Sequence, residues 1–269
     1  MEIKDNVLKG TNVQPPVWSK NTSGKFEPGL PDTVVIHYTA GPFKASLYTL
    51  TNPRVKASAH VLVDRDGTIT QLVPFDTIAW HAGSSSYQGR NGMNKYSIGI
   101  EIVNSGYLTK SGNVFRSQFG SAYNPTDVIQ AVHKNQTSPK YWHVYTEEQI
   151  QAVTELCRLL IEDKGIKHIV GHVDIAPMRK EDPGPAFPLK RLEKQLLGDT
   201  RDEDSGEQLP QSGRVVAETL NIRETPNTGQ KIALPLKKGT KVKILDNVDG
   251  WYKVTTEIEG WVMGKYIET

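Results

Sequence analysis

The sequence predicts two domains: an α/β domain with a mixed central sheet flanked by helices, and a small all-β barrel after it. Three observations predict this arrangement. Short apolar runs typical of strands alternate with one long amphipathic pattern as far as residue 197. The acidic, polar stretch 198–212 has almost nothing to bury and is typical of a linker. Residues 213–269 contain only short β-type runs separated by turn residues.

The first strands can be read from their composition. Residues 34–39 form a short apolar run of the kind that buried strands show. Residues 59–64 and 68–73 are two further runs, separated by a turn that contains Asp66 and Gly67. Because an Asp-Gly pair between such runs is a strong hairpin signal, we expect these two strands to pair.

Residues 98–102 predict the next strand of the sheet. Ile98, Ile100 and Ile102 share one face of an extended segment, and Glu101 lies on the other face. If the isoleucines pack beneath helices, Glu101 faces the opposite side of the sheet, where an active site could form.

Residues 105–146 are less regular, with many aromatic residues among Gly, Ser, Asn and Pro. Long irregular insertions are often binding loops or lids, so this stretch is either a wall of a substrate cleft or a plain surface insertion. A short helix is expected around residues 127–134. His133 and His143 belong to no recognisable motif and are expected at the surface.

Residues 147–161 predict a helix, because apolar residues recur there at helical spacing. Thr146 could cap its start, and Gly165 could end it. Cys157 is the only cysteine, so no internal disulfide can form. Its place on the apolar face of the helix predicts a small core residue.

Composition excludes several classes of protein. The net charge of +2 and the pI near 8.4 give no broad basic field, so nucleic acid is not an implied partner. A run of about 18 apolar residues, as a membrane span needs, does not occur. Residues 1–20 contain no apolar signal-type region, which predicts a cytoplasmic or non-classically released protein. A chain whose signal was already removed would look the same.

Residues 171–187 are the most informative stretch, because they combine an imidazole, carboxylates and a cation with prolines and glycines. Zinc takes nitrogen and oxygen ligands of this kind, and a catalytic zinc usually keeps one position open. His172 is one candidate ligand, delivered to the sheet edge by a short strand. The carboxylate could come from Asp182, whose direction the following proline restricts, or from Asp174. His37, at the end of a core strand, is a third candidate on a rigid element.

Six motifs of the chain resemble, in order and spacing, those of type 2 N-acetylmuramoyl-L-alanine amidases. This superfamily also includes the peptidoglycan recognition proteins and the phage lysozyme-type amidases. The motifs are Val34-Val35-Ile36-His37, Ser58-Ala59-His60, Asp66-Gly67, Ala79-Trp80-His81-Ala82-Gly83, Ser97-Ile98-Gly99-Ile100-Glu101 and the run from His172 to Phe187. The resemblance covers residues 15–197 and leaves residues 1–14 as an N-terminal extension.

The resemblance implies a zinc amidase that hydrolyses the amide between N-acetylmuramic acid and L-alanine of the peptidoglycan stem peptide. It implies zinc ligands at His37, His172 and Asp182. It assigns the general-base role to Glu101 and transition-state stabilisation to Lys180. Because the histidines must be neutral to bind metal, activity is expected to fall in mild acid as zinc is lost.

The resemblance also suggests substrate contacts, and it leaves Asp174 as a structural residue. The residues expected to line the cleft or contact substrate are Tyr38, His60, Trp80, His81 and Arg90. Trp80 could equally belong to the core, and His60 is expected to be structural rather than a fourth ligand. In the phage lysozyme-type branch a tyrosine precedes the histidine of the second motif. This chain has Ala59 there, so the role of that tyrosine does not carry over.

Residues 213–269 resemble a bacterial SH3 domain through their Leu-Asn-Ile-Arg, Gly-Trp-Tyr-Lys-Val and Gly-Trp-Val sequences. Its expected strands are 215–217, 220–223, 241–245, 250–254 and 260–262. In wall hydrolases such modules commonly bind peptidoglycan. The alternative is a packing or oligomerisation module with Trp251 and Trp261 in its core.

Three functions compete at this point. The first is an amidase of wall lysis or remodelling that acts on peptidoglycan, which the C-terminal module favours. The second is a recycling amidase that acts on anhydro-muropeptides, which the missing signal favours. The third is a non-catalytic peptidoglycan receptor on the same fold. Such receptors typically lack a metal ligand, whereas this chain retains all the inferred ligands together with Glu101 and Lys180.

Overall fold

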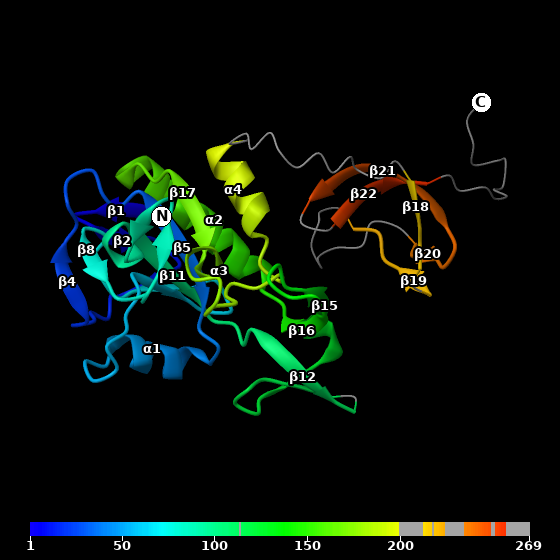
Figure 1. Ribbon diagram of the computed structural model, residues 1–269, viewed down its shortest axis with the longest axis horizontal. Coiled ribbons are helices and arrows are strands. Elements are labelled where there is room, and N and C mark those ends of the chain that lie inside the picture. Colours follow the sequence, from blue (N-terminus) through cyan, green and yellow to red (C-terminus); the bar gives the residue numbers. More distant parts are fainter. Residues whose placement is uncertain (113, 199–211, 217, 224–233, 249–250, 257–269) are drawn as a thin grey trace. The chain divides into compact units, whose positions relative to one another are not determined.

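The computed structural model describes residues 1–112, 114–198, 212–216, 218–223, 234–248 and 251–256 (Figure 1). These residues belong to two units, Met1–Thr200 and Arg201–Thr269. The first unit is a mixed α/β fold, as the sequence predicts, and the described part of the second contains strands alone.

Six strands form the central sheet of the first unit. In spatial order they are β17 (His168–Gly171), β5 (Thr33–Tyr38), β11 (Ser97–Ile102), β6 (Val61–Val63), β7 (Ile69–Gln71) and β3 (Val13–Gln14). The strands from β17 to β6 run parallel, whereas β6 and β7 are antiparallel. The sheet is therefore mixed, and the hairpin predicted around Asp66 and Gly67 is confirmed.

Helices cover both faces of this sheet (Figure 1). They are α1 (Phe43–Thr51), α2 (Glu147–Lys164), the short α3 (His172–Ile175) and α4 (Leu189–Leu197). The isoleucines of β11 pack with α2 and α4 in one core cluster, which also contains Cys157. On the opposite face, Leu50 of α1 packs against Leu62 of β6. Glu101 therefore points away from α2, as its place in the alternating strand predicts.

The ends of α2 follow the sequence signals. The hydroxyl of Thr146 accepts a hydrogen bond from the backbone N–H of Gln149, whose side chain bonds back to the N–H of Thr146. This capping box satisfies two backbone donors that the first turn leaves free. Gly165 ends the helix at φ 70°, a conformation that glycine adopts without strain. Within the described residues, no helix combines the length and the apolar character that crossing a membrane requires.

Residues 1–14, expected as an extension, are part of the first unit. The strands β1 (Glu2–Lys4) and β2 (Val7–Lys9) pair with each other, and β3 joins the central sheet. Leu8 is buried in the main core cluster. The N-terminal ammonium lies 2.8 Å from a carboxylate oxygen of Glu155 on α2.

The insertion at 105–146 folds into a five-stranded antiparallel sheet. In spatial order its strands are β14 (Ala122–Tyr123), β13 (Val114–Arg116), β12 (Tyr107–Ser111), β16 (Pro139–His143) and β15 (Val128–Val132). The short helix expected around 127–134 is wrong, because these residues form β15 after a 3-10 turn at Pro125–Asp127. Pairing with β16 over five residue pairs decides between the two structures.

The two histidines of this insertion are buried, so their expected surface position is wrong. His133 is 2% exposed and stacks on the ring of Trp142, with ring centroids 5.7 Å apart. His143 is 7% exposed and accepts a hydrogen bond from the backbone of Ser105. His133 is enclosed because the insertion folds against Glu181, whereas the ring of His143 packs within the insertion, with its centroid 4.4 Å from that of Tyr123.

Small elements complete the described chain. In the first unit these are β4 (Thr22–Lys25) paired with β8 (Thr77–Ala79), β9 (Ser86–Tyr87) paired with β10 (Arg90–Asn91), and the 3-10 turn Met93–Lys95. In the second unit they are β18 (Ser212–Arg214), β19 (Thr219–Leu220), β20 (Leu236–Lys237), β21 (Lys241–Val248) and β22 (Trp251–Thr255). The strand expected at 260–262, with Trp261, lies outside the described residues, as does the side chain of Trp251.

Candidate active site

Three candidate ligand atoms converge in one cleft of the first unit. Nδ1 of His37 lies 2.8 Å from Nδ1 of His172 and 3.1 Å from Oδ2 of Asp182. The third side of this triangle, from His172 Nδ1 to Asp182 Oδ2, is 2.9 Å. All three side chains are buried, with at most 6% of any residue exposed. The structure therefore brings together the three residues that the sequence proposes as ligands.

The donor set fits a zinc ion. Two imidazole nitrogens and one carboxylate oxygen make a three-ligand site with an open fourth position, as catalytic zinc sites use. Tetrahedral bonds of about 2.0–2.1 Å would separate neighbouring ligand atoms by about 3.4 Å. The observed separations are shorter by a few tenths of an ångström, so small side-chain movements would admit the ion.

Strand register assembles this centre. His37 on β5 is paired with Glu101 on the adjacent parallel strand β11. On the other side of β5, Gly171 ends β17 level with the residue before His37, so the chain delivers His172 beside it. A Cβ at Gly171 would lie 2.6 Å from Pro183, so only glycine lets the residues around Asp182 approach this strand.

His81 sets the tautomer of His37. Nε2 of His81 lies 3.2 Å from the carbonyl oxygen of Ser97, which can only accept, so this nitrogen carries the proton. The hydroxyl of Ser97 donates to Met93 and leaves that assignment unchanged. Nδ1 of His81 is then the acceptor for Nε2 of His37 at 2.9 Å. Consequently Nδ1 of His37 keeps its lone pair free for a metal, a common arrangement around metal-bound histidines.

Gly99 makes room for this relay. A Cβ at Gly99 on β11 would lie 2.4 Å from the ring of His81. The His81 ring therefore packs directly over the strand two residues before Glu101. A single glycine in a strand interior often marks such a close approach.

A carbonyl orients the second imidazole in the same way. Nε2 of His172 donates to the carbonyl oxygen of Ala82 at 3.1 Å, which frees its Nδ1 for a metal. The guanidinium of Arg179 donates to the same carbonyl at 2.8 Å and to that of Ser84 at 2.8 Å. Arg179 thus ties the loop after α3 to the loop that carries His81.

Asp174 has a structural position and is not a ligand. Its Oδ2 accepts a hydrogen bond of 2.6 Å from the backbone N–H of Gly171, at the start of α3. Its Oδ1 forms an ion pair with Lys134 of the insertion. Of the two carboxylates that the residue pattern left as alternative metal ligands, only that of Asp182 faces the two histidines.

Burial shifts the titration of the candidate ligands. The pKa of His37 is lowered to about 4, chiefly by burial and further by the proximity of His172, against the opposing effect of Asp182. His37 is therefore neutral in mild acid, the form in which an imidazole can bind metal. Although burial opposes ionisation of Asp182, the adjacent imidazoles of His172 and His37 hold its pKa well below the usual range.

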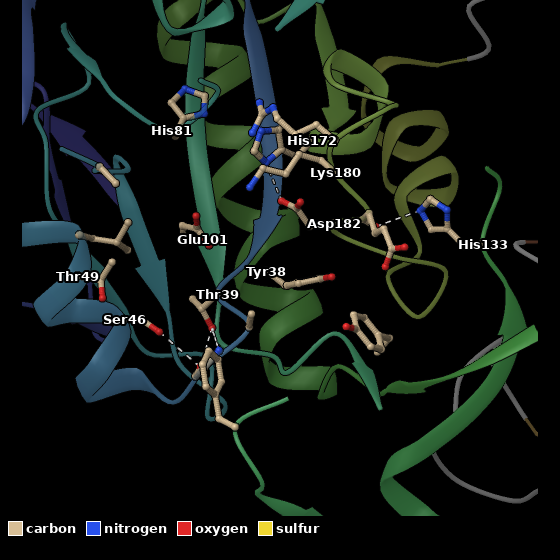
Figure 2. A pocket seen from close by; sticks show the side chains of 18 of the residues that line it. Tyr38, Thr39, Ser46, Thr49, His81, Glu101, His133, His172, Lys180 and Asp182 are labelled. Carbon is tan, nitrogen blue, oxygen red and sulfur yellow. Dashed lines mark hydrogen bonds and ion pairs between the residues drawn. The ribbon is translucent and has the colours of Figure 1, made fainter. Parts of the chain in front are cut away.

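Glu101 and Lys180 face the same cleft (Figure 2). The pKa of Glu101 is raised to about 8, chiefly by burial and further by the charge of Asp182, against the opposing effect of Lys180. In the described part of the chain, Oε2 of Glu101 is enclosed and has no hydrogen-bond partner. A carboxylate with a pKa near neutrality and a free oxygen is suited to take up a proton.

The cleft has a volume of about 1210 Å³. Helix α1 contributes Ser46 and Thr49 to one wall, and the insertion contributes Tyr107 and His133 to another (Figure 2). Of the two alternatives for residues 105–146, the structure therefore favours a wall of the cleft. The space is large enough for a ligand of drug size or larger.

Comparison with known proteins decides the family. Residues 27–185, more than half of the chain, match the N-acetylmuramoyl-L-alanine amidase family. The chain belongs to this amidase family. Residues 218–268 match the bacterial SH3 domain. The two matches lie in different parts of the chain.

Named relatives agree with this assignment. The chain is 37% identical to the N-acetylmuramoyl-L-alanine amidase AmiD of Escherichia coli K12, over 61% of this chain and 53% of AmiD. It is 38% identical to the 1,6-anhydro-N-acetylmuramyl-L-alanine amidase AmpD of the same organism, over 60% of this chain and 67% of AmpD. A crystal structure of a selenomethionine AmpD derivative superposes with a TM-score of 0.50 at 28% identity, covering 73% of this chain and 99% of that one. The chain thus spans about half the length of AmiD.

Three of the expected substrate contacts reach the cleft of the amidase domain. Tyr38, Trp80 and His81 line it. The indole of Trp80 donates to the hydroxyl of Ser23, and the residue is half-buried, so Trp80 belongs to the cleft wall and not to the core. His81 is 9% exposed, and both of its ring nitrogens are engaged. It therefore acts mainly on His37.

The other two expected contacts lie elsewhere in the amidase domain. His60 is fully buried, with Nδ1 accepting from the backbone of Gly99 and Nε2 donating to the carbonyl of Thr77. This makes it a structural imidazole that does not line the cleft. Arg90 pairs with Asp32 at 2.8 Å and also lies outside the cleft lining.

Proposed function

We propose that the chain is a zinc-dependent N-acetylmuramoyl-L-alanine amidase acting in wall lysis or remodelling. Its substrate would be the amide between N-acetylmuramic acid and L-alanine of the peptidoglycan stem peptide. One observation carries the proposal: the ligand atoms of His37, His172 and Asp182 converge beside Glu101 on a chain of this family.

The zinc ion would be held by Nδ1 of the two histidines and by the carboxylate of Asp182. When bound, zinc supplies a Lewis acid that polarises the amide carbonyl and lowers the pKa of a water molecule to about 7. The three ligand residues are buried, which strengthens the electrostatic effects of neighbouring groups on them.

Glu101 is proposed as the general base. Its carboxylate takes the proton of the attacking water and returns it to the departing amine of L-alanine. The pKa of about 8 matches this role, because a base titrating near the working pH can both accept and release the proton. Lys180 is proposed to place positive charge where the carbonyl oxygen becomes an oxyanion.

The C-terminal match supports polymeric peptidoglycan as the substrate. Residues 213–269 are proposed to bind the wall, joined to the amidase domain by a linker at 198–212. Tethering to the polymer raises the concentration of scissile bonds around the catalytic cleft. The soluble fragment is the second candidate substrate, because several relatives are named 1,6-anhydro-N-acetylmuramyl-L-alanine amidases.

Digestion of intact sacculi and of purified anhydro-muropeptide, each with and without a metal chelator, tests the proposal. We expect release of stem peptides from both substrates, loss of activity with chelator, and recovery with added zinc. Activity on sacculi that falls when residues 213–269 are removed, with unchanged activity on the soluble fragment, supports wall binding. Binding of sacculi without hydrolysis of either substrate would instead identify a receptor.

A further inference from the structure

The turn between β15 and β16 contacts the part of the chain that carries most of the active site. We name residues 133–140 the clamp hairpin and residues 172–182 the catalytic segment. The catalytic segment contains His172, Lys180 and Asp182. Apart from the four-residue helix α3 it has no regular secondary structure, so no sheet hydrogen bonds hold its second half in place.

Glu181, between Lys180 and Asp182, receives most of these contacts. Its carboxylate oxygen Oε1 accepts hydrogen bonds from the amide of Gln136 and from the ammonium of Lys140, the latter at 3.1 Å. Its backbone carbonyl accepts from Nε2 of His133 at 3.1 Å, the contact drawn as a dashed line from His133 in Figure 2. Three side chains of the clamp hairpin thus hold one residue of the catalytic segment.

Other contacts extend along the same segment. The side-chain amide of Asn135 donates to the carbonyl oxygen of Pro177 at 3.1 Å. Lys134 forms its ion pair with Asp174, the residue whose carboxylate orders the start of α3. The clamp hairpin therefore contacts the catalytic segment near its start, at its middle and beside Asp182.

The tautomer of His133 is determined, as that of His81 is. Its Nε2 faces a carbonyl oxygen and must donate, while its Nδ1 accepts from the backbone N–H of Asn135 at 3.2 Å. Burial lowers the pKa of His133, which favours the neutral ring of this arrangement. Stacking on Trp142, which is 1% exposed, fixes the plane of the ring.

We propose that the clamp hairpin is a positioning element of the active site, with Glu181 as its principal positioning residue. By holding the backbone at residue 181, it sets where the flanking side chains of Lys180 and Asp182 lie relative to His37 on the rigid sheet. Displacements of about 1 Å at a catalytic group can cost 10²-fold in rate. The inference rests on the proposed zinc site at His37, His172 and Asp182.

The partial exposure of Lys140 and Glu181 determines how much zinc affinity should fall when either side chain is lost. The side chains of Lys140 and Glu181 are 38% and 31% exposed, so water screens their ion pair. Loss of Lys140 alone should weaken zinc binding by about two- to fivefold, the range for one partly exposed pair. Loss of the Glu181 carboxylate removes two contacts at once and should weaken zinc binding by about tenfold, the lower end for groups that orient metal ligands.

The experiment measures zinc affinity by chelator competition in the full chain carrying Glu181→Ala or Lys140→Ala. Lys110→Ala is the matched control. Lys110 also lies on the insertion and over aromatic rings, 5.6 Å from the Phe115 centroid, whereas the Lys140 ammonium lies 4.9 Å from that of Tyr107. Only Lys140 reaches Glu181, so Lys110→Ala should bind zinc as the unaltered chain does. The absorption spectrum of the cobalt-substituted protein should change for Glu181→Ala and stay unchanged for the control.

Rescue separates positioning from general stability. The exchanged pair Glu181→Lys with Lys140→Glu restores the contact with reversed charges and should recover most of the zinc affinity. Turnover of Glu181→Ala on muropeptide should fall more than KM rises. Unaltered zinc affinity and cobalt spectrum in Glu181→Ala would overturn the clamp while leaving the zinc site in place. An unaltered chain that binds no zinc would overturn both.

Discussion

The two halves of the active site are built in different ways. His37 and Glu101 lie side by side on β5 and β11, central strands whose position the sheet register and the buried isoleucines determine. His172, Lys180 and Asp182 lie on the catalytic segment, which polar contacts from distant residues hold against the sheet. We call these the strand half and the loop half.

This difference shows which half of the active site is preorganised. Atoms of the strand half cannot move without disturbing the core, because protein interiors are close-packed. The loop half depends on hydrogen bonds that each contribute about 1 kcal/mol, so it can be displaced without unfolding the domain. A metal ion bound by His37 together with His172 and Asp182 would join the two halves.

Removal of zinc should have the largest effect, and the two halves of the site should respond to it differently. Activity on muropeptide should fall roughly 10⁴-fold in the chelated protein, because the ion contributes several kcal/mol to the transition state. Amide hydrogen exchange should then accelerate in the catalytic segment, while β5 and β11 stay protected. A metal-free preparation that remains fully active between pH 5 and 8 would contradict the zinc mechanism. Equal exchange in both regions would contradict the division into halves.

Glu101→Gln tests the strand half alone. Turnover should fall about 10³-fold, within the range for loss of a general base, while zinc affinity stays close to that of the unaltered chain. Lost zinc binding in this variant would show that Glu101 acts on the metal site and not on the substrate water. Equilibrium dialysis with zinc, beside steady-state kinetics, distinguishes these results.

In the zinc-free protein, Glu101→Gln is also expected to increase stability relative to the unaltered chain, by an amount that depends on pH. Because the pKa of Glu101 is raised from 4.5 to about 8, the folded protein binds its proton more tightly than the unfolded chain does. The zinc-free protein therefore loses stability as the pH rises from about 4.5 to about 8. Glu101→Gln removes this loss, so its unfolding temperature should exceed that of the unaltered chain at pH 8 and match it near pH 4. A gain that is equal at both pH values would argue against the raised pKa.

Lys180→Ala tests the loop half. Turnover should fall about 10²-fold with little change in KM, because the ammonium is proposed to act on charge that develops only in the transition state. Lys190→Ala, at an exposed position of α4, is the control for loss of one positive charge. Weaker substrate binding with unchanged turnover in Lys180→Ala would remove this residue from the catalytic assignment.

The sequence predicts the position of Glu101 better than that of His133 for a physical reason. Alternation of side chains along residues 98–102 is a local property, so it correctly places Glu101 opposite the buried isoleucines. The buried position of His133 depends on Glu181, 48 residues away along the chain. No pattern around His133 encodes that contact.

The misassigned strand β15 shows a second limit. The apolar residues of 128–132 fit helical spacing as well as a buried strand, and only pairing with β16 resolves the ambiguity.

The role of His81 is indicated by one feature of the sequence that composition alone does not show. Gly99 interrupts a run of isoleucines in β11, and such a glycine indicates that another group approaches the strand closely.

His81→Ala should have the smallest effect of the four and tests whether the strand half needs its relay. The change removes the acceptor of the His37 Nε2 proton and leaves a buried donor without a partner. Zinc affinity should fall about tenfold, as is typical when a group that orients a metal ligand is lost. His60→Ala is the matched control, because His60 is also buried beside Gly99 and its ring packs against that of His81, with centroids 5.9 Å apart, but it does not contact His37. Both variants should unfold at lower temperature, yet only His81→Ala should lose zinc affinity and turnover.

Gly99→Ala, whose Cβ would press on the His81 ring, should reproduce the zinc effect with His81 intact. If His60→Ala weakens zinc binding as much as His81→Ala does, the effect comes from general loosening of the sheet and the relay has no specific role.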